Sequence, residues 1–202
     1  MDRYILEMPN IIPPELCKRL IDKFEKDPRK KKGVIGGIDN MRHIDESLKK
    51  SVEIHFTSVG GWEKEDAELS KYVSIAIKKY LDALKNNFRD KGNEDIFGDI
   101  WGVNLVDTGF DLQRIDRGSK YAWHHDGYID DRGRIANILM YLNTLEPHEG
   151  GTTELISGRK IRPEVGKIVM FPASWTFAHC GNEVKAPHKY ICCSLLRTAA
   201  SA

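Results

Sequence analysis

The sequence predicts a mostly β protein, a barrel or sandwich of strands that is buttressed on one side by helices. From about Trp101 onward, short runs rich in Ile, Val, Leu and Tyr alternate with turn clusters, which is typical of antiparallel barrels. Before that point, two longer segments have the apolar spacing of amphipathic helices. The 202 residues contain no internal repeat, low-complexity tract or interdomain linker. We therefore expect one domain over residues 1–202, in which 1–100 supply helical support and amino-terminal strands and 101–202 form the β core.

The first elements are a strand and a helix. Residues 4–8 are expected to form a short strand. A helix then opens at Pro13-Pro14-Glu15, since proline suits the first turn and an acid there faces the positive end of the helix dipole. It should end near Pro28, and its apolar residues keep to one face: Leu16, Leu20, Ile21 and Phe24.

A basic run and a second helix follow. Residues 29–32 are Arg-Lys-Lys-Lys beside glycines, a pattern more typical of a solvated loop than of a phosphate site. Residues 33–50 are expected to be mobile, and residues 33–45 and 130–133 are candidate loops that close over a substrate. Residues 52–56 alternate like a strand. The clearest helix covers residues 66–88, with an apolar side chain every three or four positions, and it stops in a polar stretch at 89–93.

The second half supplies the strands of the barrel. Apolar runs at residues 112–115, 135–142, 167–171 and 190–196 are the expected strands, and glycine-containing turn clusters occupy 116–119, 130–133 and 147–151.

Composition excludes several classes of function. Lys plus Arg total 31 and Asp plus Glu total 30, so no overall field attracts nucleic acid or an anionic membrane. No apolar run is long enough to span a membrane, and no apolar signal core follows Met1, so we expect a cytoplasmic protein. The four cysteines form no CxxC or zinc spacing and are expected to be reduced thiols.

The most informative motif is a histidine followed two residues later by an aspartate. On a strand, His124 and Asp126 would face the same way and could hold one ion, while His125 would face the other side. Two imidazoles and one carboxylate are the donors of Fe(II) sites with open coordination positions, and zinc is less expected. A second histidine is therefore needed from elsewhere in the chain.

Three histidines are candidates for that third ligand. His148 lies in a turn with proline and two glycines, and His188 would face away from Lys189 on a strand. His179 follows an aromatic-rich segment, residues 171–178, that could exclude water, so it is our choice. Lys189 lies ten residues beyond it and could anchor an anionic co-substrate.

These motifs resemble those of the prolyl 4-hydroxylase branch of the Fe(II)/2-oxoglutarate dioxygenases. The similarity covers most of the chain and is carried by residues 112–126, by the arginine and LMYL strand of 134–142, by the EGGTT turn of 149–153, and by 179–184 with the lysine at 189. Two positions depart from the family pattern. Ile115 stands where many members have a tyrosine that contacts the co-substrate, and Leu195 where a tryptophan is common.

The resemblance implies a double-stranded β-helix core and a set of site residues. By it, His124, Asp126 and His179 are the Fe(II) ligands and Lys189 pairs with the distal carboxylate of 2-oxoglutarate. Thr153 matches a position that contacts the same co-substrate, and Tyr121 lies near where a further contact is expected. Arg134 matches a position near the peptide substrate. Ascorbate commonly keeps the iron of such enzymes reduced.

Three functions follow in order of expectation. The first is hydroxylation of a peptidyl proline with O₂ and 2-oxoglutarate, releasing succinate and CO₂. Trp123, Trp175 and Phe177 flank the ligands and would suit a substrate groove, although wall packing explains them equally well. The second is hydroxylation of a free amino acid or other small molecule. The third is a metal-binding interaction barrel without turnover, against which the intact set of four site residues argues.

Overall fold

The computed structural model describes residues 2–36, 42–88, 104–127 and 133–199. In the first half the elements are 3₁₀ helix η1 (Asp2–Tyr4), strand β1 (Leu6–Met8), helix α1 (Pro14–Lys26), strands β2 (Lys31–Lys32), β3 (Ile35–Gly36), β4 (Arg42–His43) and β5 (Val52–His55), 3₁₀ helix η2 (Phe56–Ser58) and helix α2 (Glu63–Phe88). The second half contains β6 (Leu105–Asp107), β7 (Asp111–Asp116), β8 (Tyr121–His124), β9 (Arg134–Tyr141), η4 (Pro147–Glu149), β10 (Thr153–Leu155), β11 (Lys160–Ile161), β12 (Ile168–Pro172), η5 (Trp175–Phe177), β13 (His179–Gly181) and β14 (His188–Thr198).

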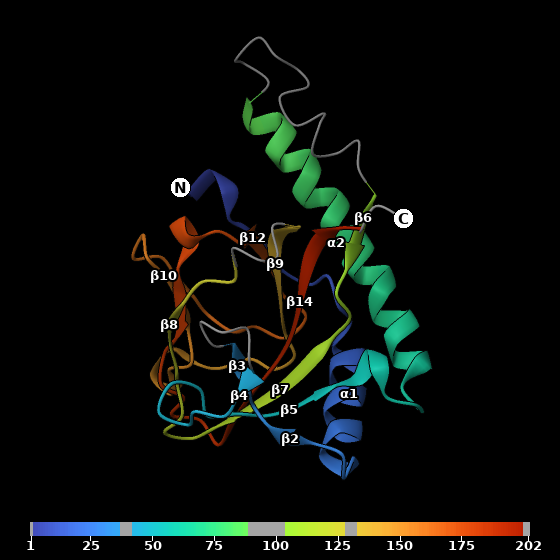
Figure 1. Cartoon of the computed structure of the whole chain (residues 1–202), viewed down its shortest axis with the longest axis vertical. Helices are drawn as coiled ribbons and strands as arrows, with labels where there is room; N and C mark the ends of the chain where they lie inside the picture. Colours follow the sequence, from blue (N-terminus) through green and yellow to red (C-terminus); the bar gives the residue numbers. More distant parts are fainter. Residues whose placement is uncertain (1, 37–41, 89–103, 128–132, 200–202) are drawn as a thin grey trace.

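Two antiparallel sheets form the barrel. Within the described residues, the large sheet has eight strands in the order β1-β12-β9-β14-β7-β5-β2, with β6 also paired to β14. The small sheet has the order β11-β10-β13-β8, and β3 and β4 form a separate hairpin. Figure 1 shows α1 and α2 on one side of the large sheet and the strands β8 and β10 of the small sheet on the other. The predicted mostly β fold with buttressing helices is confirmed, and its architecture is that of a double-stranded β-helix.

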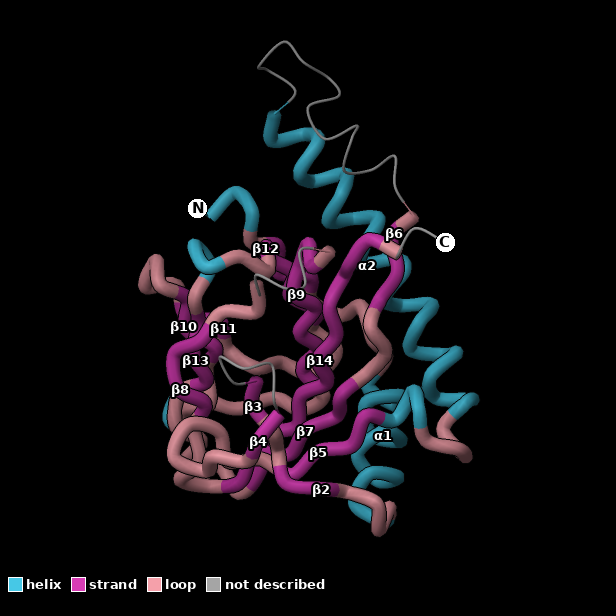
Figure 2. The backbone as a smooth tube through the Cα atoms, in the orientation of Figure 1, coloured by secondary structure: helices cyan, strands magenta, loops and turns pink. Residues whose placement is uncertain are grey.

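Side-chain alternation along the large sheet produces two apolar layers. On β9, Ile138 and Met140 join the helix-side core, which also holds Leu20 and Val73, one from each helix. The alternate side chains on β9 point into the barrel and meet residues of the small sheet, such as Leu155. Strand β9 therefore buries both faces, one toward the helices and one toward the small sheet, and Figure 2 shows the large sheet between these two layers.

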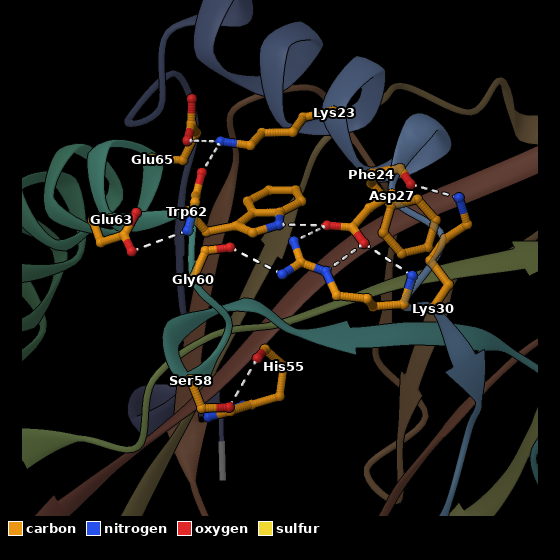
Figure 3. A network of polar contacts seen from close by, with 12 residues as sticks. Lys23, Phe24, Asp27, Lys30, His55, Ser58, Gly60, Trp62, Glu63 and Glu65 are labelled. Carbon is orange, nitrogen blue, oxygen red and sulfur yellow. Dashed lines mark hydrogen bonds and ion pairs between the residues drawn. The ribbon is translucent and has the colours of Figure 1, made fainter.

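The helices are joined by a polar network beneath the large sheet (Figure 3). The fully buried Trp62 indole donates to Asp27 Oδ2 at 2.8 Å, and the Arg29 side chain and backbone N–H also donate to this carboxylate. These bonds hold the pKa of Asp27 well below its usual range, the Arg29 guanidinium contributing most. Trp62 also stacks on Phe56, with ring centroids 4.9 Å apart. The network fixes the end of α1 against the turn that precedes α2.

Several predicted boundaries were wrong in detail. The first strand is shorter than residues 4–8, because η1 takes up Tyr4. Helix α2 begins at Glu63, three residues before the predicted start, with its acidic first turn at the positive end of the dipole. Lys31–Lys32 form an edge strand instead of a loop.

No helix of the described residues is long and apolar enough to cross a membrane.

Parts of the predicted loops fall outside what the structure describes. The candidate lid at 33–45 contains the β3–β4 hairpin, and residues 37–41 between those strands lie outside the described residues. Residues 89–93, most of the 130–133 turn and Trp101 are likewise outside them. The lid therefore stays a prediction.

Candidate active site

His124, Asp126 and His179 lie together inside the barrel. One ligand atom from each can be chosen so that all three lie within 4.8 Å of one another. Strand β13 pairs with β8 so that His179 is directly opposite His124, and their ring centroids are 4.2 Å apart. His179 Nε2 is 3.5 Å from Asp126 Oδ2. Pairing of two short strands therefore brings together histidines that are far apart in the sequence.

One premise of the sequence prediction was wrong. Strand β8 ends at His124, so Asp126 lies in the bend after the strand and not on it. The Asp126 carboxylate still reaches the two imidazoles, and the Arg134 guanidinium donates to the Asp126 main-chain carbonyl at 3.1 Å. Arg134 thus holds the bend in place, and it does so from the first residue of β9.

Backbone carbonyls set the orientation of both imidazoles. His124 Nδ1 is 2.9 Å from the Ala122 carbonyl oxygen, and His179 Nδ1 is 3.2 Å from that of Phe177. Because a carbonyl only accepts, both Nδ1 atoms are the donors, and each Nε2 keeps a lone pair for an ion. Burial lowers the pKa of His124 to about 4, with the neighbouring His179 adding to the effect, and burial also lowers the pKa of His179. Both rings are therefore neutral ligands at pH 7.

The three residues open onto a cavity of about 220 Å³ inside the barrel. It is lined by strands of both sheets, including β7, β8, β9, β10, β13 and β14. Lys189 lies in its wall and is 4% exposed. Its ammonium donates to the Gly151 carbonyl at 2.7 Å and is 5.4 Å from the centre of the Tyr141 ring.

Lys189 is a buried cation without a buried anion beside it. Among the described residues, no carboxylate lies within ion-pair distance of its ammonium, and burial lowers its pKa to about 8. A buried charge of this kind is unfavourable unless something pairs with it. An anionic ligand in the cavity would provide that partner.

Two hydroxyls lie near Lys189, and one of them, that of Thr153, lines the cavity. The Tyr141 hydroxyl donates to Thr153 Oγ1 at 2.8 Å, and both residues are buried. Thr153 was predicted as a co-substrate contact, and it lines the cavity. Tyr141 was missed as a site residue, although its LMYL strand had been singled out. Its position beside Lys189 became evident only from the pairing of β9 with β14, in which Tyr141 is opposite Ile191.

Comparison with known families agrees with this geometry. Residues 110–197 match the family model described as the 2OG-Fe(II) oxygenase superfamily. The matched segment contains the metal cluster and Lys189. Comparison with curated proteins gives no match. The predicted resemblance to the prolyl 4-hydroxylase branch of these oxygenases is confirmed by the solved structures that the chain is similar to.

Those solved structures share the fold over nearly the whole chain. A viral collagen prolyl hydroxylase from Paramecium Bursaria Chlorella virus-1, in complex with 2OG, is 18% identical with a TM-score of 0.64, covering 98% of this chain and 97% of that one. A prolyl hydroxylase from Trichoplax adhaerens, in complex with a hypoxia inducible factor peptide fragment, is 16% identical with a TM-score of 0.71, covering 97% and 84%. A Pseudomonas putida prolyl-4-hydroxylase is 16% identical with a TM-score of 0.66, covering 96% and 92%.

The donor set fits a non-haem Fe(II) ion. Two neutral imidazole nitrogens and one carboxylate oxygen are the ligands that such an ion takes, and all three residues line the cavity, where the ion would activate O₂. The other histidines considered as ligands are elsewhere. His148 is exposed on η4, and His188 is exposed and pairs with Asp116 at 2.8 Å. His125 is exposed too.

Tyr121 lies against the metal ligands. Its ring stacks on the His124 imidazole, with centroids 3.7 Å apart, and it lines the cavity. Lys49 was not singled out from the sequence, but its ammonium is 5.3 Å from the Tyr121 ring centre and 2.8 Å from Glu53 Oε2. Lys49 lines the cavity together with Tyr121 and His124, and Glu53 holds its ammonium from behind.

The aromatic residues predicted to flank the ligands are placed differently from one another. Trp175 is 75% exposed on η5 and Trp123 is 51% exposed on β8. Phe177 is buried in the core between the sheets. None of the three lines the cavity, and neither does Arg134. Substrate contacts by Arg134 and Trp175 therefore stay predictions.

Proposed function

We propose that this oxygenase hydroxylates a prolyl residue of a peptide or protein, consuming O₂ and 2-oxoglutarate and releasing succinate and CO₂. The observation that carries the proposal is a single cavity that contains both a His-Asp-His cluster and a buried lysine with no carboxylate partner among the described residues. The packing of the barrel does not require the His-Asp-His cluster and the lysine to lie in one cavity. Oxidation that consumes 2-oxoglutarate requires a metal site and an anchor for the distal carboxylate in the same cavity.

His124, Asp126 and His179 would hold the metal, and the Nδ1 bonds to Ala122 and Phe177 would keep both rings aimed at it. Bound Fe(II) supplies the site for O₂ activation coupled to 2-oxoglutarate decarboxylation. Lys189 would pair with the distal carboxylate of 2-oxoglutarate, with Thr153 and Tyr141 beside it and Tyr121 near the metal end. The apolar wall around these groups would exclude water and strengthen the ion pair. Ascorbate is the proposed reductant for the metal.

The prolyl substrate is supported by the solved neighbours, which are prolyl hydroxylases, one of them in complex with a peptide fragment. A small-molecule substrate is the second candidate. It is favoured by Ile115 and Leu195, which line the cavity where this chain departs from the family pattern.

Succinate release separates these candidates. Purified protein is incubated with Fe(II), ascorbate and 2-oxoglutarate across a panel of proline-containing peptides and free amino acids. Succinate that depends on a peptide, together with a gain of one oxygen at proline in the mass spectrum, is the expected result. Coupling to free amino acids alone would favour the second candidate, and H179A provides the control for metal-dependent turnover.

A further inference from the structure

Asn137 is the most unusual polar residue of the barrel interior. It lies on β9, is 3% exposed and lines the cavity. Its neighbours Ala136 and Ile138 point to the helix-side core, so the Asn137 side chain points into the barrel. Within the part of the chain that the structure describes, no residue forms a hydrogen bond with its amide.

Two half-buried asparagines of the described residues are satisfied, whereas the half-buried Gln113 of β7 lines the same cavity as Asn137. Asn143 accepts from the Tyr190 backbone N–H at 2.7 Å and donates to the His188 carbonyl at 3.1 Å. Asn182 donates to Thr152 Oγ1 and Glu154 Oε2. Among the described residues, Ser51 Oγ is the one enclosed side-chain polar atom without a partner, so the Asn137 amide is open to the cavity. The open cavity in front of Asn137 therefore points to a ligand that supplies the missing bonds.

The strand register places Asn137 at the metal end of the cavity. On one side it is opposite Phe171 of β12, whose ring contacts the His179 ring edge-on at 5.0 Å between centroids. On the other side it is opposite Leu195 of β14. Lys189 is six positions back along the same strand, which corresponds to about 20 Å at the usual rise per residue. A five-carbon diacid that pairs with Lys189 and binds the metal near His179 does not need a hydrogen bond from Asn137. This amide is therefore assigned to the part of the cavity in which the substrate would bind.

The chemistry of a carboxamide selects the kind of group that it binds. Asn137 offers one acceptor oxygen and two N–H donors. A carboxylate only accepts and would leave the amide oxygen without a donor. An amino-acid residue in extended conformation presents its N–H and its C=O on the same side, as in a hydrogen-bonded pair of antiparallel strands. Proline lacks the N–H, so such a residue must be a neighbour of the target proline.

We propose that Asn137 is a specificity-determining residue that binds the main-chain N–H and C=O of a non-prolyl residue next to the target. The inference rests on the proposed function and sharpens it, because it requires an extended peptide and not a free amino acid. Asn137 acts on substrate binding, since neither the metal ligands nor Lys189 depend on its amide.

The test uses the proline peptide that gives the fastest succinate release and two analogues, each N-methylated at one of the residues flanking the proline. In the wild type, one of the two N-methyl groups should raise KM about tenfold, the effect of losing one hydrogen bond to a buried group. Asn137→Ala should raise KM for the unmodified peptide about tenfold, with kcat changed less than twofold. In Asn137→Ala the N-methyl penalty should disappear, since the two changes remove the same bond.

Two further measurements distinguish binding from folding. Peptide affinity, measured by anaerobic titration calorimetry, should fall in Asn137→Ala and Asn137→Ser by the same factor as KM rises, whereas 2-oxoglutarate affinity stays unchanged. The thermal midpoint of both variants should stay close to that of the wild type, because no described residue forms a hydrogen bond with the Asn137 amide. Asn87→Ala is the control, since Asn87 is exposed on α2 and donates only to the Arg3 carbonyl.

Each outcome decides the inference. Unchanged peptide KM and affinity in Asn137→Ala, or an N-methyl penalty that persists there, overturns it while leaving the prolyl hydroxylase proposal intact. A lowered thermal midpoint with unchanged peptide affinity would make Asn137 a structural residue. A wild type that oxidises no peptide in the panel refutes the proposed function, and this inference with it.

Discussion

Replacing Lys189 with methionine should stabilise the protein and remove its affinity for 2-oxoglutarate. Burial lowers the pKa of Lys189 from 10.5 to about 8, and a shift of this size corresponds to about 3 kcal/mol of unfavourable free energy for the charged form. The variant also leaves the Gly151 carbonyl without its donor, which costs about 1 kcal/mol. The expected net gain is about 2 kcal/mol at pH 7, measured by urea denaturation without ligand.

The pH dependence has a defined sign. The folded pKa is below the unfolded one, so the cost is fully present below pH 8 and is relieved as pH rises from about 8 to 10.5, where the unfolded chain binds more protons. Wild-type stability should therefore rise relative to the variant across this window. Affinity for 2-oxoglutarate should fall above pH 8, as the ammonium that pairs with the carboxylate loses its proton.

A second buried lysine provides a matched control. Lys167 is 7% exposed in its side chain but pairs with Glu7 at 3.2 Å and with Glu164 at 3.1 Å. Lys167→Met should therefore destabilise the protein, by about 1–2 kcal/mol, and leave 2-oxoglutarate affinity unchanged. The reasoning would be refuted if Lys189→Met were less stable than the wild type at pH 7 while still binding 2-oxoglutarate normally.

Three further variants test separate parts of the structure. Tyr141→Phe removes the donor to Thr153 and should weaken 2-oxoglutarate binding several-fold by calorimetry, and an unchanged affinity would remove Tyr141 from the site. Arg134→Ala frees the Asp126 bend and should lower Mn(II) affinity about tenfold by electron paramagnetic resonance, so equal affinity would contradict its positioning role. Asp27→Asn should cost about 2–4 kcal/mol at pH 7 by urea denaturation. That difference should shrink below about pH 4, because a depressed carboxylate pKa stabilises the fold only above the unfolded value, and a pH-independent difference would show the charge to be irrelevant.

The sequence alone predicted the elements that have a regular apolar pattern and the site residues that have recognisable ligand chemistry. Both helices and the longer strands follow from apolar periodicity, and the bounds of β7, β9, β12 and β14 differ from the predicted ones by three residues or fewer. The metal cluster was predicted from ligand chemistry and the resemblance. The short strands β6, β10, β11 and β13, of two or three residues, exist because partners pair with them, and no local pattern marks them.

The inner wall of the cavity was the least predictable part. Which side of β9 faces inward depends on its pairing with β12 and β14, so neither Tyr141 nor Asn137 could be assigned to the site beforehand. Lys49 joins the site only because residues distant in sequence place it beside Tyr121. Trp175 had the composition of a groove residue, but its position on a short outer 3₁₀ helix leaves it exposed.

The most direct measurement is an anaerobic titration of 2-oxoglutarate into Fe(II)-loaded protein, followed by the charge-transfer absorption that arises when the keto acid chelates the metal. The wild type should form the band with one equivalent of 2-oxoglutarate. Lys189→Met should retain the metal but need far more ligand, and H179A should form no band. A wild type that gives no band, or an H179A protein that gives a full one, would contradict a shared site for iron and 2-oxoglutarate in this cavity.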